Sequence, residues 1–300
     1  MSSPRSWLFV LQCSIGAAAC GSSSGTTCTT DDQCPSHFCR VDGTCGPVTN
    51  DAPAAPLDGG SDATSGVCTP NMDGTITAAE LPLAAGQSAK FRIATNATWN
   101  TAGTSNTDGS RDWDLSGQLS GDADQTLALS SPTGAWWASD YAGASYSAVL
   151  SASSNLLGVF AVDSTGVTLL GVVSPTAGSS KTELMYDPPA RIVAVPFMAG
   201  STWTSKSTVT GTAEAVPVDY DEEYDSSVDA VGTMKTPYGS FPVLRVATSL
   251  TRTEGVVTVL TNKTFSWMAE CFGAVATVQS QSNEAGSEFS NDAEVERLAP

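Results

Sequence analysis

Two stretches late in the chain decide the fold: GSFPVLRVATSL at residues 239–250 and VVTVLTNKTFSWM at residues 256–268. Successive side chains of a β-strand point to opposite faces, so residues two apart share a face. Two sets of residues share a face in this way: Leu244, Val246, Thr248 and Leu250 in the first stretch, and Phe265, Trp267, Ala269 and Cys271 further on. The connection Thr253-Glu254-Gly255 has the length and chemistry of a hairpin turn. We therefore expect neighbouring antiparallel strands here.

The same pattern of short β-branched and aromatic runs, punctuated by Gly, Pro, Asn and Asp, extends back to Val67. The expected strands are Ser88–Ala94, Trp113–Ser120, Gln125–Ser130, Ser145–Ser151, Leu156–Ala161, Val167–Val173, Arg191–Pro196, Ser201–Thr212, Ala215–Tyr224, Ser226–Thr233, Gly239–Leu250, Val256–Met268 and Phe272–Gln279. The segment with the clearest helical periodicity is Asn291–Leu298, which we expect to form a short helical tail. The predicted fold is mainly β: a small disulfide-rich N-terminal module, then a long antiparallel β meander forming a barrel, half-barrel or sandwich.

Composition excludes several classes of function. The 300 residues carry 13 Lys+Arg against 31 Asp+Glu, a formal net charge of −18. Such a chain would be repelled by phosphate, so we expect no nucleic-acid partner. The sequence has one histidine, and no nucleophile–base pair or metal triad can be written from its residues. We therefore expect a non-catalytic protein without a required cofactor.

The first twenty residues have the features of a signal peptide. Arg5 precedes a broken apolar stretch that is shorter than the roughly 18 residues needed to span a bilayer. The stretch ends in Ala17-Ala18-Ala19-Cys20-Gly21, which resembles the lipobox of bacterial lipoproteins, with Ala17 where that family usually has Leu. The resemblance implies lipidation of Cys20 and an exported protein of the cell envelope, with Gly21 favouring the outer membrane. The alternative is ordinary cleavage that leaves Cys20 as a thiol.

Four cysteines are crowded into the segment CTTDDQCPSHFCRVDGTC: Cys28, Cys34, Cys39 and Cys45. So short a segment cannot bury a core, and in an oxidising compartment two disulfides are expected to hold it together. Three pairings are open, with Cys28–Cys39 and Cys34–Cys45 favoured. A zinc site with His37 is the alternative, but no two of these cysteines have the usual close ligand spacing. The segment resembles the cysteine-rich repeats of exported lipoproteins and the amino-terminal cysteine-rich region of the Dickkopf family, which implies no activity.

The expected domain organisation follows from these segments. Residues 1–20 are the signal peptide, 21–27 a tether, 28–46 the cysteine-rich module, 47–66 a disordered linker rich in Pro, Gly, Asp and Ala, and 67–300 the antiparallel β domain. Cys68 and Cys271 bracket the β domain and are expected to form a disulfide, with two buried thiols as the alternative.

A calcium loop is the one candidate metal site. TPNMDGTITAAE at residues 69–80 is close to an EF-hand-type loop, with Gly74 at the turn position and Thr69 in place of the usual first Asp. The candidate ligands are Asn71, Asp73, Thr75, Thr77 and Glu80. The alternative is an ordinary polar turn leading into the β domain.

The densest charge in the chain is the run Asp219, Asp221, Glu222, Glu223, Asp225 and Asp229. Asp219, Asp221, Glu223 and Asp225 would alternate along one strand face, with Tyr220 and Tyr224 on the other. We interpret the acidic face as solvated, since charge there discourages edge-to-edge aggregation. Calcium or a cationic partner is the alternative.

The segment GTMKTPYGSFPVLRV at residues 232–246 resembles a turn-and-strand motif of half-barrel lipoproteins related in shape to lipoprotein carriers. This resemblance implies a curved sheet around an apolar groove. The first functional hypothesis is a non-catalytic, envelope-anchored lipoprotein with an interaction or structural role. The alternative is a half-barrel that binds a lipid or other apolar ligand. The expected partners are the membrane, through the N-terminal lipid, and an apolar ligand or envelope protein.

Overall fold

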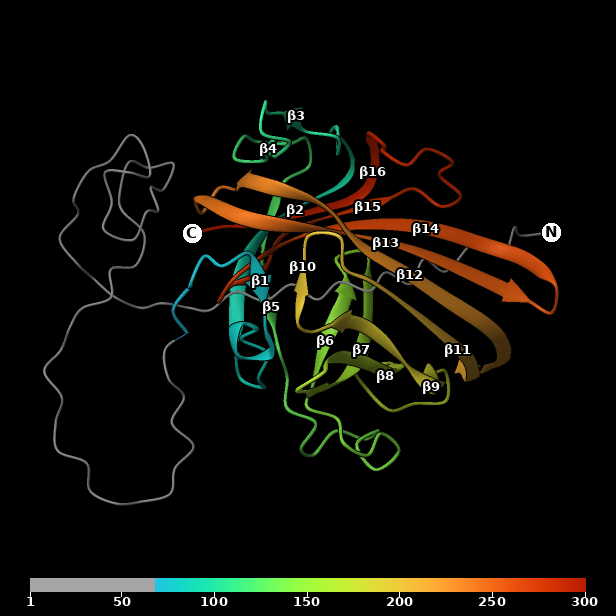
Figure 1. Ribbon diagram of the computed structural model, residues 1–300. Helices are drawn as coiled ribbons and strands as arrows, with labels where there is room; N and C mark the ends of the chain where they lie inside the picture. Colours follow the sequence, from blue (N-terminus) through green and yellow to red (C-terminus); the bar gives the residue numbers. More distant parts are fainter. Residues whose placement is uncertain (1–67) are drawn as a thin grey trace, which may run out of the picture.

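The structure is a computed structural model that describes residues 68–300. The predicted signal peptide, tether, cysteine-rich module and linker lie outside these residues. Within them the fold is mainly β, as predicted (Figure 1). A 3-10 turn, η2 (Ala78–Glu80), accompanies the strands, and no helix in this part of the chain is long and apolar enough to cross a bilayer.

The strands are β1 (Thr75–Ile76), β2 (Ser88–Thr98), β3 (Thr104–Ser105), β4 (Arg111–Asp114), β5 (Ala123–Ala128), β6 (Tyr146–Ser151), β7 (Ser154–Asp163), β8 (Gly166–Val173), β9 (Glu183–Ala194), β10 (Phe197–Met198), β11 (Thr202–Ala213), β12 (Val216–Lys235), β13 (Ser240–Glu254), β14 (Val257–Ala269), β15 (Gly273–Ser280) and β16 (Asn291–Leu298).

The long strands form an antiparallel meander that curls on itself. From β6 to β16 they pair in chain order, except that β10 pairs with β1 outside this sheet. The last strand, β16, then pairs with β2, and β2 pairs with β5. The two ends of this order, β5 and β6, meet at a bridge between Ser130 and Ser147. The sheet is therefore a nearly closed barrel, one of the three forms predicted from the meander.

The predicted helical tail is wrong. Asn291–Leu298 is strand β16, which lies between β15 and β2. Both faces of this strand are buried, with Val295 fully covered on one face and Glu294 and Glu296 on the other. Backbone partners on both sides outweigh a weak local helical preference, because strand formation depends on its neighbours more than on intrinsic propensity.

Other element boundaries also differ from those predicted. The expected strand Trp113–Ser120 ends at Asp114, because the Asp114 carboxylate accepts hydrogen bonds from the N–H and O–H of Ser116 and turns the chain. The two strands expected at Ala215–Tyr224 and Ser226–Thr233 are one strand, β12, with a bulge between Val228 and Ala230.

Two large cores cover the two faces of the sheet. The inner core brings together side chains from strands around the barrel, among them Tyr146, Phe160, Leu184, Val209, Tyr224 and Leu250. The outer core lies on the opposite face of β13 to β16, where Phe265 and Trp267 are covered by Trp113 and Phe289. Strands buried on both faces explain why clear two-residue alternation is confined to part of the sequence.

Candidate functional site

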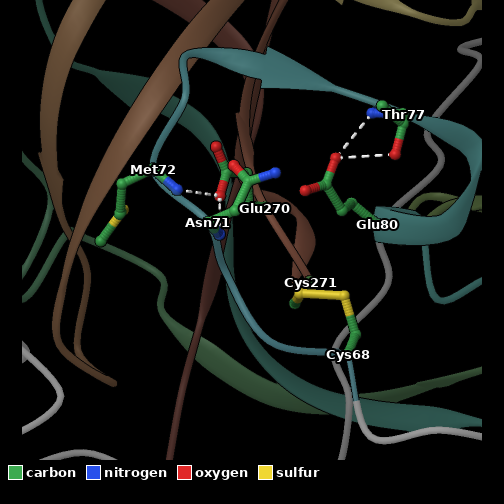
Figure 2. Close-up of a disulfide and its surroundings, with 7 residues drawn as sticks. All are labelled: Cys68, Asn71, Met72, Thr77, Glu80, Glu270 and Cys271. Atoms are coloured by element: carbon green, nitrogen blue, oxygen red, sulfur yellow. Dashed lines mark hydrogen bonds between the residues drawn. A yellow bond between two sulfur atoms is a disulfide. The ribbon is translucent and has the colours of Figure 1, made fainter.

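The structure joins Cys68 to Cys271, residues 203 apart in the sequence with Cα atoms 5.5 Å apart (Figure 2). The disulfide lies at the start of the described residues, in a leading segment that we define as residues 68–83. Four of the other cysteines with predicted roles, Cys28, Cys34, Cys39 and Cys45, lie outside the described residues, as does the predicted lipidation site Cys20.

Hydrogen bonds and packing add to the disulfide in holding the leading segment. The N–H groups of Asn71 and Met72 each donate to the Glu270 carboxylate at 2.8 Å (Figure 2), and the Cys271 N–H donates to the Glu80 carbonyl at 2.9 Å. Ile76 and Leu81 are buried against inward-facing residues of β12 and β13, including Val228 and Val246. The leading segment therefore covers one part of the barrel interior.

The five candidate calcium ligands lie in this segment, where the loop's own hydrogen bonds use side-chain oxygens of four of them, Asn71, Asp73, Thr77 and Glu80. The Asp73 carboxylate accepts hydrogen bonds from the Asn71 amide and the Thr75 N–H. The buried Glu80 carboxylate accepts the N–H and the O–H of Thr77, both at 2.8 Å, in a capping box (Figure 2). Among residues 68–300 no group of three or more His, Cys, Asp or Glu side chains is placed to hold a metal ion. These contacts give a structural role to the loop, and calcium binding stays a prediction.

A buried ion pair lies inside the barrel. Arg252 on β13 donates two hydrogen bonds to one oxygen of Glu222 on β12, at 2.9 and 2.5 Å. The other Glu222 oxygen accepts the hydroxyl groups of Tyr186 at 2.9 Å and Tyr224 at 2.5 Å. The guanidinium group of Arg252 also stacks on the Tyr220 ring at 4.1 Å. Both carboxylate oxygens thus have partners, as burial of a charge requires.

The buried environment of this ion pair shifts the pKa values of the tyrosine and arginine side chains in it. Burial, and then the negative charge of Glu222, raise the pKa of Tyr186 and of Tyr224 well above the usual value, so both hydroxyls stay protonated and donate. Burial lowers the pKa of Arg252, but the combined attraction of Glu222 and the tyrosines outweighs it and raises the pKa. Neutralised in this way, the cluster holds β9, β12 and β13 together rather than offering a reactive group.

A second polar surface lies on the inner wall where β12 to β16 run side by side. Strand register places residues of one face in continuous rows across these strands, on the same side as Tyr224 and Leu250 of the inner core. We call it the polar band, and its members are Ser226, Thr248, Thr264, Ser266, Thr277, Gln279, Glu294 and Glu296. The row that contains Ser266 and Thr277 also contains Val228 and Val246, so this part of the inner wall is mixed polar and apolar.

Some polar atoms of this band are satisfied and others are not. Ser226 and Thr248 share a hydrogen bond of 2.9 Å, and the Glu294 carboxylate accepts the Ala152 N–H at 3.1 Å. The hydroxyl of Thr277 and the amide nitrogen of Gln279 have no hydrogen-bond partner, although both residues are only 1% exposed. Buried polar groups without partners are uncommon and costly, so these two atoms reduce the stability of the folded state.

The outer face carries a separate charged cluster around Arg245. Its guanidinium group bonds to Asp229 and Glu288 at 2.7 Å each and to the Thr101 carbonyl at 2.8 Å, and it lies over the Phe265 ring. Next to it, a small hollow of about 270 Å³ is lined mainly by polar residues of β13, β14 and the 285–287 segment. The charged groups of this cluster bond to one another, which indicates that it anchors the outer loops to the sheet.

Comparison with known proteins adds little to this geometry. No protein-family model and no curated protein match the chain. A solved structure from Bacteroides fragilis NCTC 9343, described as a "putative exported protein with YmcC-like fold", is similar over 77% of this chain and 97% of its own length. The identity is 12% and the TM-score 0.32, a likeness that carries no argument about function.

Sequence reasoning placed Glu222 in the acidic run but missed its role. Glu222 lies two residues from both Tyr220 and Tyr224, so the alternation of side chains along a strand places it on their face. Glu223 and Asp225 lie on the opposite face. Arg252 follows Leu250 by the same rule. Glu294 and Glu296 were hidden because their segment matched helical periodicity, and in a helix these two residues do not share a face.

Proposed function

We propose that this protein is a non-catalytic exported lipoprotein, anchored in the cell envelope through Cys20, with a structural or interaction role. The observation that supports it most is the Cys68–Cys271 disulfide, which fixes the leading segment to the barrel. Disulfides persist in oxidising compartments and are rare in the cytosol. The buried Glu222–Arg252 cluster fits a non-catalytic role, because its oxygen atoms are engaged by Arg252, Tyr186 and Tyr224.

Membrane fractionation tests the anchor. Cys20→Ala should release the protein from the membrane fraction, since lipidation of this cysteine is what the proposal requires. Cys13→Ala, within the same leader, is the matched control and should leave membrane association unchanged. Continued membrane association of Cys20→Ala, or a Cys68 that reacts with alkylating reagent in intact cells without reductant, contradicts the proposal.

A second candidate function is a binding module with its site inside the barrel. The observation that favours it is the unpartnered pair of atoms on Thr277 and Gln279 within the polar band. Hydrogen-bonding groups on the wall favour a ligand that carries polar groups over a wholly apolar one. Extraction of the protein purified from its native envelope, followed by mass spectrometry, tests this function. A compound bound in stoichiometric amount supports a binding module, and if that compound is a lipid it supports the apolar-ligand hypothesis. The absence of any bound compound contradicts both.

A further inference from the structure

The hollow beside the Arg245 cluster contains a lysine without an acidic partner. Lys263 on β14 lies opposite Ser249 on β13, on the outer face of the sheet. Within residues 68–300, Lys263 and the exposed Lys235 are the two basic side chains that form no ion pair. Lys263 is half-buried and lines the hollow of about 270 Å³. This volume is just below that of sites for drug-sized ligands, roughly 300–1,000 Å³, so the hollow suits a small molecule.

The hydrogen-bonding groups around this lysine are only partly used by the protein. The Lys263 ammonium group has three N–H donors, and its bond to the Gly286 carbonyl takes one of them. The hydroxyl groups of Ser249 and Ser287, which also line the hollow, make no hydrogen bond with the described part of the chain. Both serines are exposed, so these donors can be reached from solvent.

The acid that lines the hollow is already neutralised. Asp229 bonds to Arg245 through both carboxylate oxygens, at 2.9 and 2.7 Å. Glu288 is held by the same guanidinium group at 2.7 Å. The charges of the Arg245 cluster therefore balance one another without Lys263.

Two further acids near the hollow have other contacts. Asp225 pairs with Ser249 on the side away from Lys263, so it lies two strand spacings, or about 10 Å, from the lysine. The Glu284 carboxylate accepts the Gly286 N–H at 3.1 Å. Lys263 is thus a cation beside an opening to solvent, with no carboxylate of residues 68–300 in contact with it.

We propose that the hollow binds the carboxylate group of a small organic acid. The Lys263 ammonium and the hydroxyl groups of Ser249 and Ser287 would donate to its oxygens, and such charge-assisted hydrogen bonds are about twice as strong as neutral ones. Ala247 and Phe265 also line the hollow and offer carbon surface to a short apolar body. A carboxylate suits this chain of net charge −18 better than a phosphate, because its single negative charge is repelled less. The site lies outside the barrel, so the inference is independent of both candidate functions.

Titration of the purified protein with butyrate, followed by saturation-transfer NMR, tests the site, because this method detects weakly bound ligands. Lys263→Met removes the cation, keeps the length of the side chain and should weaken butyrate binding by about tenfold or more. Lys235→Met, which removes the other unpaired lysine, is the matched control and should bind butyrate as wild type does. The neutral analogue 1-butanol should bind at least about tenfold more weakly than butyrate. Equal loss in both variants, equal binding of 1-butanol, or no binding of butyrate to wild type overturns the inference.

Ser249→Asp keeps the result decisive if Lys263→Met disturbs the segment that Lys263 bonds. This variant places a carboxylate opposite Lys263, where it would pair with the ammonium group in place of the ligand, and the position is exposed, so the fold should not change. Ser179→Asp adds the same charge to an exposed loop between β8 and β9 and should retain wild-type binding. Loss of butyrate binding in Ser249→Asp alone supports the site, and unchanged binding or equal loss in both variants contradicts it.

Discussion

Asp292 is a buried acid without hydrogen-bond partners for either carboxylate oxygen. Burial raises its pKa from 3.8 to about 7, and the nearby Trp99 N–H opposes this only in part. A raised carboxyl pKa means that the folded state prefers the protonated form. The free energy of unfolding should therefore fall as pH rises from about 4 through about 7, by at most about 4 kcal/mol. Asp292→Asn should flatten this dependence in urea titrations between pH 4 and 8 and stabilise the protein at pH 8. Asp219→Asn, on an exposed position, should retain the wild-type slope, and an unchanged slope in Asp292→Asn would contradict the assignment.

Glu222 shows how much a single buried charge can matter when its partners are fixed. Glu222→Gln removes the carboxylate that neutralises Arg252 and accepts two tyrosine hydroxyls. Breaking a buried pair from one side costs about 3–5 kcal/mol, whereas replacing both partners with apolar residues is often neutral. We expect a loss of this size in guanidinium unfolding for Glu222→Gln and substantial recovery in Glu222→Leu/Arg252→Met. Glu223→Gln, whose surface pair with Lys206 is worth at most about 1 kcal/mol, is the control. Equal losses of unfolding free energy in Glu222→Gln and Glu223→Gln would show that the buried ion pair contributes no more to stability than the surface pair.

At the scale of elements, β4 docks on the end of β12 as a parallel strand, and Gly232 makes this contact possible. A Cβ atom at Gly232 would come within 1.7 Å of the Arg111 carbonyl oxygen, and a backbone atom cannot move aside as a flexible side chain can. Gly232→Ala should therefore separate β4 from β12 and loosen Trp113 from the outer core, at a cost of about 1–3 kcal/mol. Urea unfolding and tryptophan emission measure the two effects. Gly117→Ala lies in a loop with open space around it and should change neither. Unchanged emission and stability in Gly232→Ala would contradict the close approach.

Elements with one polar and one apolar face were predictable from the sequence, and elements buried on both faces were not. Alternation correctly separated Tyr220 and Tyr224 from the outward acids of β12, because one face of that segment meets water. In β16, Glu294 and Glu296 are buried on the inner face and Val295 is buried on the outer face. Because both faces are buried, the sequence of this strand does not show the alternation of polar and apolar residues that identifies a strand with one face in water. The polar band was unpredictable for a related reason: it exists only once register aligns residues from five strands, and register depends on the whole sheet.

At the scale of the whole molecule, the barrel closes where β2, an early strand of the described residues, pairs with β16, the last one. The Cys68–Cys271 disulfide joins the leading segment to the turn between β14 and β15. Both features join residues that are far apart in the sequence. Bringing such residues together costs conformational entropy when the chain folds. A crosslink over 203 residues removes much of that entropy and should stabilise the fold by about 5 kcal/mol in the chain-entropy model.

Cys68→Ser/Cys271→Ser should therefore lower the melting temperature without changing the strand content measured by circular dichroism. Reductant alone is a poor test, because it would also open any disulfides among Cys28, Cys34, Cys39 and Cys45. The informative comparison adds reductant to the double variant and to wild type. If this disulfide carries the stabilisation, reductant should bring wild type down to the melting temperature of the variant and should change the variant little. A variant as stable as oxidised wild type would instead mean that hydrogen bonds from Glu270 to Asn71 and Met72, with packing of Ile76 and Leu81, hold the leading segment without the crosslink.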